Sequence, residues 1–246
     1  MTKPKRSLGQ NFLVNQAVID KIISAVCDFH PQNIIEVGPG TGALTKHLMK
    51  MKLPLILVEL DRDLAVKWKE EKQNVIEGDA LKVAWEGFAS ISETVFVSNL
   101  PYQISSSIVI DRSVEPFCIK GMVLMFQKEV AQRLMAKKST PDYGMLSVIA
   151  QVFWRIEKVC DADPKSFNPP PNVASRVLRF VRKESEVVDR KKFLSFIKSA
   201  FAQRRKLLSK NLNVERESLT RLGFKETVRA EELSPEEFVT LFASFN

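Results

Sequence analysis

Three cysteines and two histidines are all that this chain of 246 residues offers for thiol, imidazole or metal chemistry. Cys27, Cys118 and Cys160 lie far apart, without the paired spacing of a zinc site or a disulfide framework. Such sparse cysteine usage is typical of a protein in a reducing compartment. Neither His30 nor His47 has a partner at the spacing of a catalytic triad. The sequence therefore disfavours zinc chemistry and histidine-activated nucleophiles, and we expect no metal ion in the site.

Long apolar runs are also lacking. No stretch approaches the roughly 20 residues that cross a bilayer, and Met1–Arg6 is basic without the apolar centre of a secretory signal. We therefore expect a cytoplasmic protein with no membrane partner. The net charge of +8 favours a polyanionic partner. A hydrophobic content of 45% with 27% charged residues is typical of a folded globular chain.

Apolar runs alternate with helical patterns through the first half of the chain. The runs predict strands over Asn33–Val37, Pro54–Val58, Asn74–Glu77, Thr94–Ser98 and Gly121–Phe126. Helical patterns cover Asn15–Asp28, Ala43–Met49, Arg62–Glu71 and Ser105–Ser113. Because continuous apolar strands alternate with helices, we expect a parallel sheet covered on both faces.

The pattern changes after Phe126. Two helical segments, Lys128–Ala136 and Leu146–Phe153, precede two further runs that predict strands, Arg155–Val159 and Val177–Val181. The short connection between these runs favours a hairpin-like return rather than another helical crossover. We therefore expect an antiparallel strand at or near one edge of the sheet.

Strand signals stop from about Lys183 onward. Lys191–Leu212 has apolar residues at helical spacing, Gly223 is placed to end a helix, and Ser234–Glu237 is a capping box. We expect one helix to carry most of the basic residues here: Lys191, Lys192, Lys198, Arg204, Arg205, Lys206 and Lys210. The chain then divides into an α/β domain over residues 1–182 and a small helical domain over residues 183–246.

A glycine-rich loop, Glu36–Ala43, joins the first predicted strand to its helix. Glycines at this place allow a ligand to approach the backbone closely. Glu59 closes the next strand about 20 positions after Gly38, where an acid that binds ribose hydroxyls is expected, and Asp61 is the adjacent alternative. Gly38, Gly40 and Ala43 also satisfy the dinucleotide fingerprint. The loop alone therefore leaves dinucleotides and S-adenosylmethionine both open.

Three later features favour S-adenosylmethionine. Gly42 completes a Gly-x-Gly-x-Gly loop, and Asp79 follows the third strand, where an acid can accept from an adenine amino group. Asn99–Tyr102, with the sequence Asn-Leu-Pro-Tyr, follows the fourth strand at the edge where open α/β sheets bind ligands. The Asn99 side chain and the Leu100 backbone carbonyl can accept hydrogens from one planar amine, and Tyr102 can stack on its ring. A dehydrogenase needs no such group.

These residues resemble the ribosomal RNA adenine dimethyltransferases, the KsgA/RsmA family, and the resemblance covers essentially the whole chain. Further matching segments are Leu8–Leu13, Gln127–Ala131, Tyr143–Val148 and Phe167–Ser175. The resemblance implies a Rossmann-like class I methyltransferase sheet, mostly parallel with one antiparallel strand, followed by a small helical RNA-binding domain. It also implies a monomer that uses S-adenosyl-L-methionine. The implied substrate is two adjacent adenosines near the 3′ end of 16S rRNA within an immature 30S subunit, which become dimethyladenosines.

The resemblance also implies a role for each matching residue. Asn11 and Leu13 close over the methionine end of the cofactor. Gly38 and Gly40 belong to the glycine-loop contact, while Glu59 binds the ribose and Asp79 the adenine. The target base lies between Tyr102 and Phe167, with its amine held by Asn99 and Leu100, and Asn99 also contacts the cofactor. The run Arg204, Arg205 and Lys206 binds RNA.

Three alternatives remain open. A large-subunit rRNA adenine methyltransferase of the antibiotic-resistance type shares the same core. A ribosome-assembly or transcription factor on this fold would bind RNA without turnover, and a dehydrogenase would bind NADH. Methyl incorporation into separated immature subunits, S-adenosylmethionine binding and NADH binding distinguish them.

Overall fold

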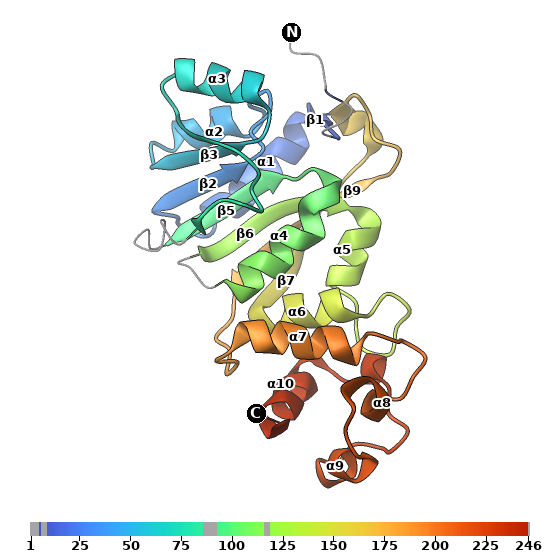
Figure 1. The fold of residues 1–246 in the computed structure, drawn as a ribbon. Coiled ribbons are helices and arrows are strands. Elements are labelled where there is room, and N and C mark those ends of the chain that lie inside the picture. Colours follow the sequence, from blue (N-terminus) through green and yellow to red (C-terminus); the bar gives the residue numbers. More distant parts are fainter. Residues whose placement is uncertain (1–4, 6–8, 86–92, 116–118, 246) are drawn as a thin grey trace. The chain divides into compact units, whose positions relative to one another are not determined.

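A computed structural model describes residues 5, 9–85, 93–115 and 119–245 (Figure 1). Met1–Pro4, Leu8 and Cys118 lie outside the described residues. The chain forms two compact units, each built from separate stretches of sequence. The first contains Met1–Arg112, Pro116–Ala131 and Ile156–Arg182. Lys183–Asn246, the expected helical domain, lies in the second unit, which also takes in Ser113–Glu115 and Gln132–Arg155.

The first unit is built on a seven-stranded sheet with the order β4-β3-β2-β5-β6-β9-β7. Its strands are β2 (Asn33–Val37), β3 (Leu55–Glu59), β4 (Asn74–Glu77), β5 (Thr94–Asn99), β6 (Ile119–Gln127), β7 (Trp154–Ala162) and β9 (Ser175–Arg182). The strands from β4 to β6 pair in parallel, and β9 is antiparallel to β6. The expected mostly parallel sheet, with its antiparallel strand near one edge, is confirmed.

The order of strands reverses at β2, which lies between β3 and β5. In open α/β sheets such a switch point opens a crevice at the carboxyl ends of the strands. The register pairs Glu36 with Val97, so the glycine loop and Asn99 leave the sheet side by side. The Ser98 hydroxyl, which donates to the Val37 carbonyl, ties the two strand ends together.

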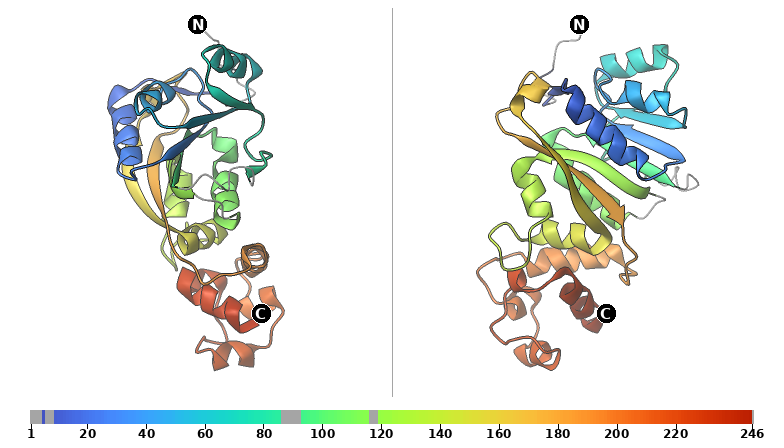
Figure 2. Two further views of the ribbon diagram at one scale, coloured as in Figure 1. Left: turned by 90° about the vertical axis from the view of Figure 1, so that its left-hand side faces the viewer. Right: turned by 180° about the vertical axis from the view of Figure 1, so that it is seen from behind.

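Helices cover both faces of this sheet. Its helices are α1 (Gln16–Cys27), α2 (Thr45–Lys50), α3 (Arg62–Glu70), α4 (Tyr102–Val114) and α5 (Lys128–Leu134). Helices α1 and α4 lie on opposite faces (Figures 1 and 2). The Asn15 side chain caps α1 by accepting from the Val18 N–H at 3.3 Å. Asparagine is among the preferred residues at this position because its oxygen satisfies an N–H that lacks a helical partner.

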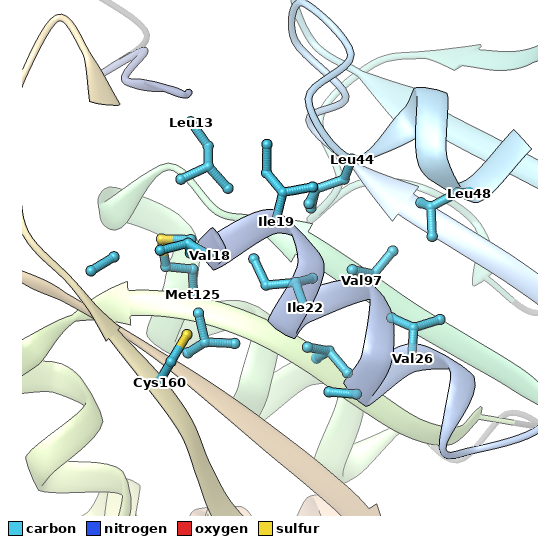
Figure 3. Packing of buried hydrophobic residues seen from close by; sticks show 14 of the residues in the cluster. Leu13, Val18, Ile19, Ile22, Val26, Leu44, Leu48, Val97, Met125 and Cys160 are labelled. Carbon is cyan, nitrogen blue, oxygen red and sulfur yellow. The ribbon is translucent and has the colours of Figure 1, made fainter. Parts of the chain in front are cut away.

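The amphipathic face of α1 forms the core with the sheet. Val18, Ile22 and Val26 project from α1 towards Val97 and Met125 (Figure 3). All five side chains are almost completely buried. Burying one such side chain stabilises a fold by about 1.5–3 kcal/mol. This packing fixes the strands whose carboxyl ends carry the candidate site.

A two-stranded sheet joins the N-terminal segment to the chain preceding β9. Here β1 (Phe12–Leu13) pairs antiparallel with β8 (Phe167–Asn168), directly after the short helix η3 (Pro164–Ser166). The Val14 N–H extends this tie by donating to the Ser166 carbonyl at 2.8 Å. The pairing brings together segments separated by more than half the length of the sequence.

The second unit contains α6 (Met145–Phe153), α7 (Arg190–Ala200), α8 (Leu208–Leu212), α9 (Arg216–Arg221), η4 (Ala230–Glu232) and α10 (Pro235–Phe245). Its centre is aromatic, since the Phe193 ring meets Phe153 at 6.0 Å and Phe242 at 5.2 Å, both edge-on. The expected capping box is confirmed. The Ser234 N–H donates to the Glu237 carboxylate, and the Glu237 N–H donates to the Ser234 hydroxyl oxygen.

The prediction of a single helix over Lys191–Leu212 is wrong. Helix α7 ends at Ala200, and α8 begins only at Leu208. The reason is the Asn211 side chain, whose amide donates to the carbonyls of Ala200 at 2.7 Å and Gln203 at 3.0 Å. These bonds satisfy carbonyls that the end of a helix leaves unpaired. The basic run 204–206 therefore lies in a turn between two helices.

Across the described residues, no helix combines the length and apolar character needed to cross a membrane.

Candidate active site

A cavity lies at the carboxyl edge of the first unit's sheet, where the loops after β2, β3 and β5 meet the N-terminal segment. With its open mouth it has a volume of about 780 Å³. Eight predicted site residues line it: Asn11, Leu13, Gly38, Gly40, Glu59, Asn99, Leu100 and Tyr102. The tertiary structure thus brings together residues from three strand ends and from the beginning of the chain.

The glycine loop is held between two aromatic rings. A Cβ at Gly42, whose φ is +92°, would lie 2.6 Å from the Trp68 ring, and one at Gly40 would lie 3.1 Å from Phe12. The Trp68 indole also donates to the Gly40 carbonyl at 3.1 Å. Gly38, with φ +67°, has open space where a side chain would begin. The loop is therefore fixed from behind while its backbone stays accessible to a ligand at Gly38.

Glu59 ends β3 and is 5% exposed. Each of its oxygens accepts one backbone N–H, from Asp61 at 2.9 Å and from Gly40 at 3.1 Å. Burial raises the pKa of this carboxyl, and the backbone donors oppose the increase. Because a carboxylate oxygen can accept two hydrogen bonds, each oxygen keeps acceptor capacity for a diol. The geometry suits a ribose.

Glu36 lines the cavity, although the glycine-loop motif that begins at this residue gave it no role. It belongs to an otherwise apolar strand and is 2% exposed. Its Oε2 has no hydrogen-bond partner within the described part of the chain. Burial raises the pKa of Glu36 to about 8, and the nearby Glu59 charge adds to the increase. An acid among buried strand residues was the signal that could have identified it.

Asn99 lies at the mouth of the cavity with a fixed orientation. Its side-chain amino group donates to the Asn11 carbonyl at 3.1 Å. Within the described chain its Oδ1 receives no hydrogen bond, so this acceptor remains for a ligand. Leu100 follows at 2% exposure, and its carbonyl is carried by the rigid Leu-Pro peptide. Two hydrogen-bond acceptors, Asn99 Oδ1 and the Leu100 carbonyl, thus belong to adjacent residues at the end of β5.

Tyr102 begins α4 and is anchored at its hydroxyl. That hydroxyl lies 2.8 Å from the Ser175 Oγ, at the start of β9. Ser175 is completely buried, and burial raises the pKa of the Tyr102 phenol. The Ser105 hydroxyl donates to the Tyr102 carbonyl at 2.9 Å and holds the first turn of the helix. The ring is therefore fixed at both ends beside the cavity.

Two predicted site residues do not line the cavity. Phe167 is 3% exposed and packs in the hydrophobic cluster with Leu13, because the β1–β8 register pairs these two residues. Asp79 follows β4 half-buried, and its Oδ1 accepts from the Leu81 N–H at 3.0 Å.

The predicted RNA-binding residues belong to the second unit. Arg204, Arg205 and Lys206 are exposed and line a shallow hollow with Gln203. The Arg204 guanidinium donates to the Thr140 carbonyl at 3.3 Å, which restrains the start of this run. No group of three or more potential metal ligands occurs among the residues that the structure describes.

The sheet order, its one antiparallel strand and the glycine loop at the switch point define a class I methyltransferase fold. A dimethyladenosine transferase from Plasmodium falciparum has this fold with a TM-score of 0.78 and 26% identity, covering 96% of this chain and 97% of that one. The 23S rRNA methyltransferase ErmE, at 24% identity and a TM-score of 0.65, shares the fold over 95% of this chain and 99% of its own.

The chain belongs to the ribosomal RNA adenine dimethylase family, which it matches over residues 1–246. It is 56% identical to a ribosomal RNA small subunit methyltransferase A from Bdellovibrio bacteriovorus, over 98% of this chain and 92% of that protein. A protein of the same name from Acidobacterium capsulatum is 39% identical over 98% of this chain and 90% of its own. The resemblance drawn from the motifs is confirmed, and the chain is a methyltransferase rather than a dehydrogenase.

Proposed function

We propose that this chain transfers methyl groups from S-adenosylmethionine to the exocyclic amines of two adjacent adenosines near the 3′ end of 16S rRNA, within an immature 30S subunit. The observation that carries the proposal is the pair of adjacent acceptors, Asn99 Oδ1 and the Leu100 carbonyl, at the mouth of the cavity. The names of the relatives, which specify the small subunit, support this choice of ribosomal particle.

The cavity residues fit S-adenosylmethionine. Glu59 is held by two backbone donors and keeps acceptor capacity for the ribose hydroxyls. The open backbone at Gly38 accommodates the close approach of the cofactor, and Gly40 shapes the same loop. Asn11 and Leu13 form the wall on the N-terminal side, where we place the methionine end. When bound, the cofactor supplies an electrophilic methyl group on a sulfonium.

Asp79 is proposed to bind the adenine of the cofactor. Its side chain lies just after β4, next to the Glu59 strand end, because β3 and β4 pair up to Glu59 and Glu77. One of its oxygens caps the following turn through Leu81, and the other can accept from an adenine amino group.

The chemical problem is the weak nucleophilicity of the adenine amine, whose lone pair is delocalised into the ring. Asn99 Oδ1 and the Leu100 carbonyl would each accept a hydrogen bond from the amine. These two bonds would orient the nitrogen lone pair towards the methyl group. The transfer is an in-line displacement, so correct orientation of the two reactants contributes about 7–11 kcal/mol to lowering its barrier. Attack forms the N–C bond as the S–C bond breaks, so a neutral thioether would leave and the methylated nitrogen would first be an ammonium. This ammonium loses a proton to water, so the mechanism needs no general base.

Tyr102 is proposed to stack on the target base, since its ring is fixed beside the cavity by Ser175. Phe167 is proposed to flank the target base on the side opposite Tyr102, as the resemblance implies. It also packs against Leu13 and thereby supports the cavity wall from within the core.

Binding of the RNA backbone is proposed for the basic turn of the second unit. Arg204, Arg205 and Lys206 are adjacent, exposed cations, and such residues bind phosphates with little need for a buried partner. We propose that the α/β domain over residues 1–182 carries methyl transfer and that residues 183–246 contribute RNA binding.

The decisive experiment offers labelled S-adenosylmethionine and the purified chain to immature 30S and 50S subunits separately. We expect label only in 30S particles, recovered as dimethyladenosine at adjacent positions near the 3′ end of 16S rRNA. Label confined to 50S particles would instead identify a large-subunit enzyme. A chain that binds the RNA but not S-adenosylmethionine would be an assembly factor without turnover.

A further inference from the structure

The N-terminal segment is tied to the first unit at a carboxylate that methyl transfer does not use. Asp61 caps α3, and its side chain is 0% exposed. Its Oδ1 accepts from the Lys5 ammonium at 2.6 Å and from the Asp63 N–H at 3.1 Å. Its Oδ2 accepts from the Gln10 side chain at 3.0 Å. Lys5 also lies 2.7 Å from the exposed Asp63 carboxylate.

Gln10 connects this contact to the cavity wall. Its side-chain oxygen accepts the Lys5 N–H at 2.8 Å while its amide donates to Asp61, so one glutamine bridges both ends of the contact. The residues that follow directly, Asn11–Leu13, line the cavity. We name the group Lys5, Gln10 and Asp61 the N-terminal clamp.

The clamp and the ribose acid share a strand end. The Asp61 N–H donates to Glu59 Oε1, and the Asp61 side chain holds Lys5 and Gln10. The segment has two further ties, from Asn99 to the Asn11 carbonyl and from β1 to β8. Both of these are hydrogen bonds between neutral groups. Among these ties the clamp alone is ionic, and the Lys5 side chain in it is 41% exposed.

We propose that Lys5 and Gln10 are positioning residues that hold the segment Gly9–Leu13 over the bound cofactor, so that the clamp sets the rate at which the cofactor leaves. This inference rests on the proposed function. A ligand walled in by Gly9–Leu13 escapes fastest when that wall swings away, and the clamp opposes this movement. Because Lys5 is partly exposed, salt weakens its contact with Asp61. Cofactor dissociation should therefore accelerate with ionic strength.

The test measures the dissociation rate of S-adenosylmethionine by stopped-flow displacement at low and high salt. At low salt we expect Lys5→Met and Asp61→Asn each to accelerate dissociation by about 2- to 5-fold. Asparagine retains the ability to cap α3, so Asp61→Asn keeps the fold. Lys5→Arg should restore the wild-type rate, and the difference between Lys5→Met and wild type should shrink at high salt.

The matched control is Lys69→Met on α3, which removes a surface lysine of similar exposure (47%) that pairs with Glu77 at 2.9 Å. It should leave the dissociation rate unchanged. The double variant Lys5→Met/Asp61→Asn should dissociate more slowly than the product of the two single effects predicts, since both substitutions remove the Lys5–Asp61 ion pair.

A Lys5→Met rate within twofold of wild type at low salt, with cofactor still bound, would overturn the clamp alone. An equal acceleration in Lys69→Met would overturn it too, because the effect would then be one of general surface charge. A wild-type chain that binds no S-adenosylmethionine would overturn the proposed function, and the clamp's role with it.

Discussion

The cavity at the carboxyl edge of the sheet and the basic turn 204–206 differ in how their charged groups are held. In the cavity Glu36 and Glu59 are buried, and backbone N–H groups fix both oxygens of Glu59. In the turn, Arg204, Arg205 and Lys206 are exposed, and the bond from Arg204 to a backbone carbonyl is long, at 3.3 Å. Buried groups act through fixed geometry, whereas exposed charges act over about a Debye length and are screened by salt. Substitutions in the cavity should therefore be residue-specific, while those in the turn should depend on total charge.

The largest effect is expected for Asn99→Ala. Removing one preorganised partner of a reacting group typically reduces turnover by about 10²- to 10³-fold, so we expect a loss of at least 100-fold in single-turnover methylation. The thermal midpoint should stay close to that of wild type. Asn74→Ala is the control, since Asn74 is an exposed asparagine at the start of β4. Methylation by Asn99→Ala within threefold of wild type would contradict the proposed role.

Next in size is Glu59→Gln, which tests whether fixed geometry matters. Glutamine has one acceptor oxygen, so it cannot serve the Gly40 and Asp61 N–H groups together. Hydrogen bonds to charged groups contribute about 1.5–3 kcal/mol, and we expect S-adenosylmethionine affinity to fall by about 10- to 100-fold in calorimetry. Glu77→Gln, at the exposed end of β4, should bind normally. Equal losses in both variants would show that only net charge counts in the cavity.

A smaller effect is expected from releasing the Tyr102 ring. Ser175→Ala and Tyr102→Phe each delete one side of the 2.8 Å hydrogen bond. A net contribution of about 0.5–1.5 kcal/mol corresponds to a roughly 3- to 10-fold decrease in kcat, with the cofactor Kd unchanged. The two substitutions should not add in the double variant, because they remove the same hydrogen bond. Additive losses would mean that Ser175 acts elsewhere.

Neutralising the basic turn should change the salt dependence of RNA affinity more than it changes the rate of methyl transfer. Replacing Arg204, Arg205 and Lys206 by glutamine should flatten the slope of log affinity against log salt. On single-stranded RNA the slope should change by about 0.7 for each phosphate that these residues no longer neutralise. Filter binding over a salt series measures this slope.

The matched control for the turn removes the same charge elsewhere. It replaces three exposed lysines of the first unit, Lys50, Lys72 and Lys82, by glutamine. We expect this variant to keep a slope close to that of wild type. Identical slopes for the two triple variants would remove the distinction between the turn and the rest of the basic surface.

Glu36→Gln should have the smallest effect on activity, but it should measurably change the pH dependence of the free energy of unfolding. Its pKa is about 8 in the fold, against 4.5 ordinarily. Between these values the unfolded chain releases a proton that the folded chain retains, so Glu36 makes the free energy of unfolding decrease as pH rises from about 5 to 8. Glu36→Gln should flatten this decrease in urea unfolding without cofactor. An unchanged slope would show that Glu36 is ionised in its cavity.

The motifs located most of the cavity because they are local patterns. Asn33–Val37 was predicted as a strand from its apolar run. Glu59 and Asn99 were predicted as site residues because each is the polar residue that ends such a run, and parallel strands bring these ends to one edge of the sheet. The capping box at Ser234 likewise depends on residues three positions apart. The presence of helices in this region could also be predicted from the sequence. The end of α7 at Ala200 could not, because the side-chain amide that satisfies its carbonyl comes from Asn211.

The sequence by itself determined the parallel sheet, the glycine loop and the family, because periodicity and motif spacing are properties of neighbouring residues. The tertiary structure alone decided that Phe167 lies in the core, that Glu36 is buried and that Lys5 reaches Asp61. Each of these depends on segments distant in the chain that meet in space. Burial and pairing at such distances leave no local pattern, so only the folded chain can specify them.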